Sequence, residues 1–427
     1  MTIPTKLFNG LLSKLGPGLL YAGAAIGVSH LVQSTRAGGM FGFDLIIAIL
    51  VIHVIKYPFF EFGPRYTAAT GNNILHGYQK LGEWAVWIYL LMTLSTMFII
   101  QAAVTVVTAG LFTHIFGLEE LGGHDPQVID AIISSLILII CFTLLVSGRY
   151  MLLDKLIKVI VLILSATTIF AVIALTLDNS NHYSSRALHF DITDTAQLLF
   201  LAAFLGWMPA PVEISVWHSI WSESKNDNEG RITSMQETLF DFRVGFIGTA
   251  FLAMCFLAIG AMVMHGSGVE FKTGGAAFAE QLLDMYRQAL GDWAYPIVAI
   301  AALTTMFSTT LTLLDAFPRT ISISLERISP QKFQHNKNNR TYISWLLITI
   351  TGTLSLLFFF TPSMGEMVKV ATVIAFVAAP VLAILNTLAM FDKSIPEEYR
   401  PGKGMLVWCL MGLASLISCS IGYLWLM

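Results

Sequence analysis

The chain has 427 residues, of which 56% are hydrophobic and only 12% charged, and its mean hydropathy is +0.72. A soluble domain carries about twice that charged fraction, so the composition excludes an ordinary soluble protein. The net charge of −3 is too small to indicate a nucleic-acid partner. The cysteines all lie in apolar runs and are interpreted as core residues, not as a disulfide framework or metal cluster: Cys141, Cys255, Cys409 and Cys419.

Eleven apolar stretches predict an all-α integral membrane protein with 11 transmembrane helices, each of about 20 residues. Barrel strands would alternate in hydrophobicity every second residue, and these stretches do not. No linker divides the chain, so we expect one domain over residues 1–427 and no separate enzyme domain. We also expect no cleaved signal before the first helix. The stretches start near Gly16, Leu45, Trp84, Val128, Leu156, Thr195, Val244, Trp293, Tyr342, Met367 and Met405.

The basic residues predict the orientation of these helices. With the N-terminus inside, only Arg36, Arg186, Lys272 and Arg287 fall on the outer side. Lys56 and Lys369 lie within helices, and the other 18 of the 24 lysines and arginines fall on the inner side. Because inner loops carry an excess of basic residues, we expect a cytoplasmic N-terminus and an external C-terminus, in the plasma or inner membrane.

Two of the predicted helices, the first and the sixth, contain residues that interrupt a helix. Two prolines in the sixth remove two backbone donors, so this helix must break there. Backbone groups freed at membrane depth are tolerated only where protein buries them or where they line a cavity. Kinks in ordinary helices are the alternative, but breaks five helices apart are typical of inverted repeats with a substrate site between them. The interrupting runs are Gly16-Pro17-Gly18, Gly23 and Gly27-Val28-Ser29-His30 in the first helix, and Gly206-Trp207-Met208-Pro209-Ala210-Pro211-Val212-Glu213 in the sixth.

Several short motifs follow one another in a specific order along most of the chain. They are Gly16-Pro17-Gly18 and Ala37-Gly38 in the first helix, Arg65 with Ala69-Thr70-Gly71 after the second, Ser147-Gly148-Arg149 with Asp154-Lys155 before the fifth, His218-Ser219 with Ser224-Lys225 after the sixth, and Ser308-Thr309-Thr310 in the eighth. This order resembles the Nramp (natural-resistance-associated macrophage protein) family of proton-coupled metal transporters. The resemblance implies the leucine-transporter fold with helices 1 and 6 discontinuous. Its five-plus-five inverted repeats would cover approximately residues 10–180 and 190–391, followed by an extra helix at 404–427.

The positions that bind metal in that family hold other residues here. Family members carry Asp-Pro-Gly-Asn in the first break, where this chain has Gly27-Val28-Ser29-His30. The family's Met-Pro-His in the sixth helix matches in two registers, either at Met208-Pro209-Ala210 or with Pro211 at the methionine and Glu213 at the histidine. The third helix lacks the usual acidic residues. The resemblance therefore implies fold and transport, but neither transition-metal import nor the usual proton route.

The candidate substrate-binding residues lie at the two breaks. His30 is an ionisable group within a membrane, which usually has a role, and simple hydrogen bonding to freed carbonyls is the alternative. Ser29 is also a candidate N-cap, and Glu213 is a candidate capping carboxylate at the third position of a half-helix that starts at Pro211. Trp207 and Met208 suit an apolar pocket wall, with plain packing as the alternative for Met208. The full set is Gly27, Ser29, His30, Trp207, Met208 and Glu213.

Two further groups are candidates for coupling and gating. Ser308 and Thr309 offer adjacent hydroxyls, which in sodium-coupled members of the wider fold help to hold sodium; bonding between helices is the alternative. In the second helix, Lys56 and Glu61 are near enough for a loose pair, and Glu61 and Arg65 are four residues apart. This cluster is interpreted as an inner ion pair or gate. We expect no cofactor, only H⁺ or Na⁺ as a coupling ion.

Three functions stay open from the sequence. The first is a secondary transporter that moves a small polar or anionic solute by alternating access, because the family's aspartate is missing and half-helix N-termini attract anions. The second is a divalent metal transporter (Mn, Fe or Mg) with His30, Met208 and Glu213 as remodelled ligands. The third is a non-transporting sensor or scaffold. Since no nucleotide-binding motif occurs, a proton or sodium gradient would drive transport. We expect an ion or small-molecule substrate, lipid as a partner, no nucleic acid and no required oligomer.

Overall fold

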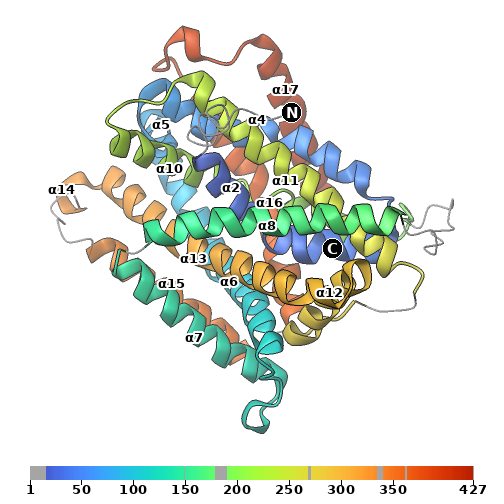
Figure 1. Ribbon diagram of the computed structural model, residues 1–427. Helices are drawn as coiled ribbons and strands as arrows, with labels where there is room; N and C mark the ends of the chain where they lie inside the picture. The colour runs from blue at the N-terminus through green and yellow to red at the C-terminus, as the bar shows by residue number, and fades with distance from the viewer. Residues whose placement is uncertain are drawn as a thin grey trace, which may run out of the picture.

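The computed structural model describes residues 16–148, 150–177, 190–267, 271–333, 340–360 and 363–426. Within these ranges every regular element is a helix, which confirms the all-α prediction. Figure 1 shows α8 lying across the face of the bundle, in front of α11, α13 and α16. The elements are α2 Pro17–Ala25, η1 Ser29–Ser34, α3 Thr35–Phe41, α4 Ile46–Thr70, α5 Ile74–Leu81, α6 Glu83–Ile115, η2 Leu121–Gly123, α7 Pro126–Val146, α8 Tyr150–Leu177, α9 Thr195–Trp207, α10 Ile214–Glu229, α11 Met235–Val263, α12 Gly275–Leu290, η3 Asp292–Ala294, α13 Tyr295–Ile328, α14 Pro330–Phe333, α15 Arg340–Phe360, α16 Met364–Phe391, η4 Glu397–Tyr399 and α17 Lys403–Leu426.

The helices have the lengths that a bilayer requires. Among the described residues, 8 helices are long and apolar enough to cross a membrane: α4, α6, α7, α11, α13 with η3, α15, α16 and α17. Two shorter apolar helices are Val161–Leu177, within α8, and α9. With the interrupted first segment, these helices occupy the positions of the predicted spans, whereas the number of crossings stays a prediction.

The first predicted helix is interrupted over two residues only. α2 ends at Ala25, Ile26 and Gly27 lie outside the helix, and the chain continues through the π-helix η1 into α3. The interruption is therefore shorter than the predicted stretch of Gly27 to His30. A Cβ at Gly27 would lie 3.0 Å from the Thr309 side chain on α13. Glycine thus allows α13 to pass close to the break. The π-helix η1 that follows is of a kind frequent at functional sites.

The sixth predicted helix breaks between α9 and α10. α9 ends at Trp207, Met208 has an extended backbone, and α10 begins at Ile214. The two prolines lack an N–H, and helical bonding resumes where the N–H groups of Ile214 and Ser215 donate to the carbonyls of Pro211 and Val212. The break was predicted, but the prediction that the second half-helix starts at Pro211 was wrong. Glu213 directly precedes α10 instead of occupying its third position, and its side chain makes no capping bond.

Helix α11 packs closely against both halves of the first segment. A Cβ at Gly18 in α2 would overlap the carbonyl oxygen of Asp241, and one at Gly38 in α3 would overlap that of Leu257. The Asp241 carboxylate also accepts hydrogen bonds from the N–H groups of Gly16 at 3.0 Å and Gly18 at 2.8 Å, at the start of α2. Small residues allow membrane helices to approach in this way, so α11 holds both sides of the break in place.

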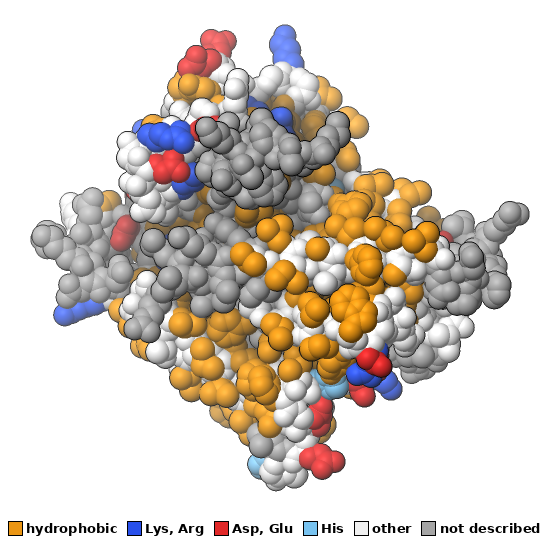
Figure 2. Space-filling model, in the orientation of Figure 1, with side chains coloured by type: hydrophobic (Ala, Val, Ile, Leu, Met, Phe, Trp, Pro, Cys, Tyr) orange, Lys and Arg blue, Asp and Glu red, His pale blue; other side chains and the backbone are white. Residues whose placement is uncertain are grey.

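The outer surface is apolar over much of the bundle. Figure 2 shows hydrophobic side chains across the central part of one face, with charged side chains nearer its edges. On α8, Leu162, Ile163, Phe170 and Ile173 are exposed, as expected for helices in contact with lipid. The shorter helix α12 packs against α6, α8 and α13.

Candidate substrate site

The two breaks meet at Ser29. Its hydroxyl oxygen lies 2.7 Å from the carbonyl oxygen of Ala25, at the end of α2, and 3.0 Å from that of Pro209, between α9 and α10. The Ser29 hydroxyl, which has one proton to donate, therefore lies within hydrogen-bond distance of a carbonyl from each break. The alternative N-cap role is not observed, because Ser29 is the first residue of η1, Val28 holds the N-cap position, and the Ser29 hydroxyl faces carbonyls instead.

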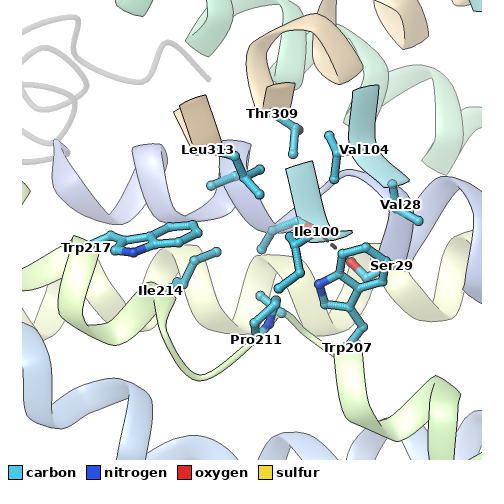
Figure 3. Close-up of a pocket in the computed structure, with 13 residues that line it drawn as sticks. Val28, Ser29, Ile100, Val104, Trp207, Pro211, Ile214, Trp217, Thr309 and Leu313 are labelled. Carbon is cyan, nitrogen blue, oxygen red and sulfur yellow. Dashed lines mark hydrogen bonds between the residues drawn. The ribbon is translucent and has the colours of Figure 1, made fainter. Parts of the chain in front are cut away.

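A cavity lies between the breaks, enclosed by the first and sixth segments together with α6 and α13. Its volume is about 20 Å³, which is space for about one water molecule. Trp207 and Ser29 lie on one side of it and Trp217 and Leu313 on the other (Figure 3). The lining side chains are mostly apolar, with two hydroxyls: Ala24, Ala25, Val28, Ser29, Ile100, Val104, Trp207, Ala210, Pro211, Ile214, Trp217, Thr309 and Leu313.

His30 points away from this cavity. Its ring is fully buried; Nδ1 lies 2.7 Å from the Ser29 hydroxyl and Nε2 lies 3.0 Å from the carbonyl oxygen of Thr249 on α11. Phe256, also on α11, meets the ring edge to face. Both ring nitrogens are thus engaged, and the imidazole connects the first break to α11.

Glu213 points toward α6. Its carboxylate accepts hydrogen bonds from Thr93 at 3.2 Å and from Thr96 at 3.3 Å, and the residue is only 2% exposed. It is not among the residues that line the cavity. The structure therefore directs His30 and Glu213 to different helices. The sequence signal for the Glu213 partners was present, since Thr93 and Thr96 are three residues apart on one side of an apolar helix.

Lys56 lies at the end of α9, on the other side of the sixth break. Its ammonium donates to the carbonyl oxygens of Leu205 and Gly206, each at 2.8 Å, and of Met208 at 3.0 Å. The predicted loose pair with Glu61 is wrong. Five residues on a helix turn through about 500°, so the two side chains leave opposite sides of α4.

Glu61 forms the other predicted contact. Its carboxylate lies 2.8 Å from the Arg65 guanidinium and also accepts from the Tyr57 hydroxyl at 2.6 Å. Arg243 of α11 approaches it at 3.9 Å, and Arg65 donates to the carbonyl of Tyr399 at 3.4 Å. The carboxylate thus connects α4 with α11 and with the segment before α17. Whether this cluster acts as a gate stays a prediction.

The remaining candidates divide into those near the cavity and those behind it. Thr309 lines the cavity, and its hydroxyl lies 3.3 Å from the carbonyl oxygen of Gly23 in α2 and 3.1 Å from that of Thr305 in its own helix. Ser308 is buried beside it. Trp207 lines the cavity, whereas the fully buried Met208 does not, and it contributes its carbonyl to Lys56 instead. Among the described residues, no group of three or more His, Cys, Asp and Glu side chains is placed to hold a metal ion.

Comparisons with known proteins agree with this architecture. The sequence model of a family described as natural resistance-associated macrophage protein-like matches residues 18–426. An uncharacterized protein of Pasteurella multocida (strain Pm70) is 36% identical over 428 residues, covering 98% of this chain and 93% of that protein.

Two groups of solved transporters share the fold. A crystal structure of a mutant of the Eremococcus coleocola manganese transporter superposes with a TM-score of 0.68 at 13% identity, covering 98% of this chain and 87% of that chain. MhsT in complex with L-phenylalanine superposes with a TM-score of 0.61 at 16% identity, covering 95% of this chain and 98% of that one. These likenesses confirm the leucine-transporter fold, and the family match extends over nearly the whole chain. The chain therefore belongs to the Nramp family of integral membrane transporters.

Proposed function

We propose that this secondary transporter, which is not an enzyme, moves a small polar or anionic solute by alternating access between the two breaks. A proton or sodium gradient would supply the energy. The N-terminus would be cytoplasmic and the C-terminus external, in a plasma or inner membrane, because most lysines and arginines fall on the side assigned as inner.

The chemistry of the cavity wall carries this proposal. The lining side chains include no carboxylate, imidazole or thioether, which are the groups that hold divalent metals. They offer instead an apolar surface with two tryptophans and the hydroxyls of Ser29 and Thr309. A few placed polar groups on an apolar wall are typical of sites for small organic molecules. The start of α10 also borders the cavity through Pro211 and Ile214, and helix N-termini favour anions.

The volume of the cavity supports alternating access. Space for one water is too small for an organic solute, so binding requires α9 and α10 to move relative to the first segment. Ser29, which lines the cavity, joins these two segments through its contact with the Pro209 carbonyl. We expect this contact to break when the site opens.

A divalent metal is the second candidate, because solved structures of the same fold are manganese transporters. Its expected ligands would be His30, Met208 and Glu213. Here His30 is bonded to Ser29 and Thr249, while Glu213 is bonded to Thr93 and Thr96. Both side chains would have to exchange all these partners to share an ion, which makes this the less favoured candidate.

Uptake into proteoliposomes distinguishes the two candidates. Purified protein is reconstituted, and manganese entry is followed with an internal metal indicator, with and without a proton or sodium gradient. In parallel, neutral and anionic amino acids, carboxylates and inorganic anions are tested for saturable uptake. Thr309→Val removes one cavity hydroxyl, and Thr304→Val, on the same helix, removes a half-buried hydroxyl that does not line the cavity and serves as a control.

We expect saturable uptake of at least one solute, weakened by Thr309→Val and unchanged by Thr304→Val, with no saturable manganese uptake. Saturable manganese entry that no organic solute or anion competes with would replace this proposal with the metal candidate. A folded protein that moves none of these compounds would contradict both and favour a sensor or scaffold.

A further inference from the structure

The end of α9 presents an arrangement that usually binds a free cation. The carbonyl oxygens of Leu205, Gly206 and Met208 converge on one point, and the Lys56 ammonium occupies it at 2.8, 2.8 and 3.0 Å. An ammonium has three N–H donors and no acceptor, so three carbonyls satisfy it completely. The side chain is fully buried, and within the described part of the chain it makes no ion pair.

Electrostatics explain why a cation is held there. The C-terminal end of a helix carries partial negative charge on its unpaired carbonyls. Within a membrane no water is present to satisfy them. In transporters with broken helices, half-helix C-termini and unwound carbonyls bind the diffusible cation. Here the positive charge is instead the ammonium of Lys56, a side chain of α4, so it is covalently attached to the protein.

The position of the ammonium is fixed by packing on α4. Gly63, seven residues further along, has no side chain, and a Cβ there would overlap the carbonyl oxygen of Ser215 in α10. The Gly63 N–H also donates to the Ser215 hydroxyl at 3.2 Å. α4 therefore contacts the half-helix on one side of the break through Gly63 and the other half-helix through Lys56.

We propose that Lys56 is a tethered cation that fills the carbonyl site at the end of α9 and excludes Na⁺ and divalent metals from it. The site is a receptor for a primary ammonium or a small monovalent cation, occupied from within the chain. This inference concerns the cation site alone and holds whichever solute the transporter moves.

Chemical rescue tests the proposal on the purified full chain. Lys56→Ala removes the charge and leaves a space the size of a short alkylammonium ion, whereas Lys56→Met removes the charge but fills that space. Thermal unfolding is followed by tryptophan fluorescence in methylammonium, ammonium, sodium or potassium chloride. Tetramethylammonium chloride at the same ionic strength is the control, since its cation is too large and has no N–H.

We expect both variants to have a lower Tm than the unmodified protein in tetramethylammonium. Methylammonium should raise the Tm of Lys56→Ala in a saturable way, as a ligand that binds only the folded state does. It should leave the Tm of Lys56→Met and of the unmodified protein unchanged. A purely structural role for the aliphatic chain would not produce rescue in one variant alone.

Other outcomes contradict the proposal. If folded Lys56→Ala responds no more to methylammonium than to tetramethylammonium, no cation site exists at the end of α9. The same conclusion follows if Lys56→Ala cannot be recovered in either salt while Lys56→Met can. If neither variant can be recovered, Lys56→Arg, which keeps the charge, should still be folded. Failure to recover folded Lys56→Arg as well would show that charge is not the property required.

Discussion

The hydroxyl of Ser29 lies 3.0 Å from the carbonyl oxygen of Pro209, and this contact joins two interruptions that are 180 residues apart in the chain. Ser29 also lines the cavity. One hydroxyl, with a single proton to donate, thus lies within reach of carbonyls from both broken helices.

Replacing Ser29 should therefore affect transport more than an ordinary buried serine does. Ser29→Ala leaves the carbonyls of Ala25 and Pro209 without this donor and should cost about 0.6 kcal/mol, the average measured for hydrogen bonds between membrane helices, and at most about 1.7 kcal/mol. Ser34→Ala is the matched control, because Ser34 is also buried in η1 but bonds only to the Ser29 carbonyl. Solute uptake and Tm are measured for both. Equal effects on uptake would show that the contact between the breaks has no special role.

The threonines that face Glu213 should be required for stability. Thr93→Val removes one of the two threonine donors to a buried carboxylate, and we expect a loss of about 1.5–3 kcal/mol, the usual contribution of a hydrogen bond to a charged group. Thr113→Val is the control on the same helix, because the buried Thr113 hydroxyl has no hydrogen-bond partner in the described structure. Its replacement should change the Tm little. Thermal unfolding in detergent compares the two, and a Tm lowered equally by both would contradict the assigned role of Thr93.

His30 should matter through its hydrogen bonds and not through metal. His30→Ala removes the connection between Ser29 and the Thr249 carbonyl on α11, so solute uptake should fall. His53→Ala removes another buried histidine, on α4, whose bond runs only to the Ile49 carbonyl of its own helix, and it should leave uptake nearer to normal. Manganese uptake is measured with the same liposomes. Saturable manganese entry that His30→Ala abolishes would mean that the metal candidate is correct.

Adjacent glycines in α3 offer a test of the packing against α11. A Cβ at Gly38 would overlap the backbone of Leu257, so Gly38→Ala should destabilise the protein by about 1–3 kcal/mol, as overpacked cores do. At Gly39 the nearest atoms are the Met264 Cβ at 3.3 Å and its sulfur at 3.4 Å, and a flexible methionine can shift. Gly39→Ala should therefore be tolerated. Comparable Tm values for the two variants would argue against the close approach of these helices.

The sequence predicted the helical fold and both breaks, because glycine and proline act locally on the backbone. It did not predict the partners of Lys56, since Leu205 lies 149 residues away and only the packing of α4 against α9 brings them together. Spacing along α4 favoured Glu61 as the partner of Lys56, but Glu61 contacts Arg65, and Lys56 contacts α9 instead. Glu213 was expected at the third position of a half-helix that starts at Pro211, but α10 starts one residue after it and its side chain makes no capping bond. Local patterns thus indicated which residues are unusual, and tertiary packing determines what each one contacts.

The closed cavity has a consequence for any affinity that is measured. If only a small fraction of molecules is open at equilibrium, the apparent dissociation constant exceeds the intrinsic one by the inverse of that fraction. A weak apparent affinity is then compatible with a well-matched site. Trimming the indole of Trp207, which occupies part of the space between the breaks, would lower the free energy needed to admit a solute. Tighter binding would then arise from a side chain that was removed and not from a new contact.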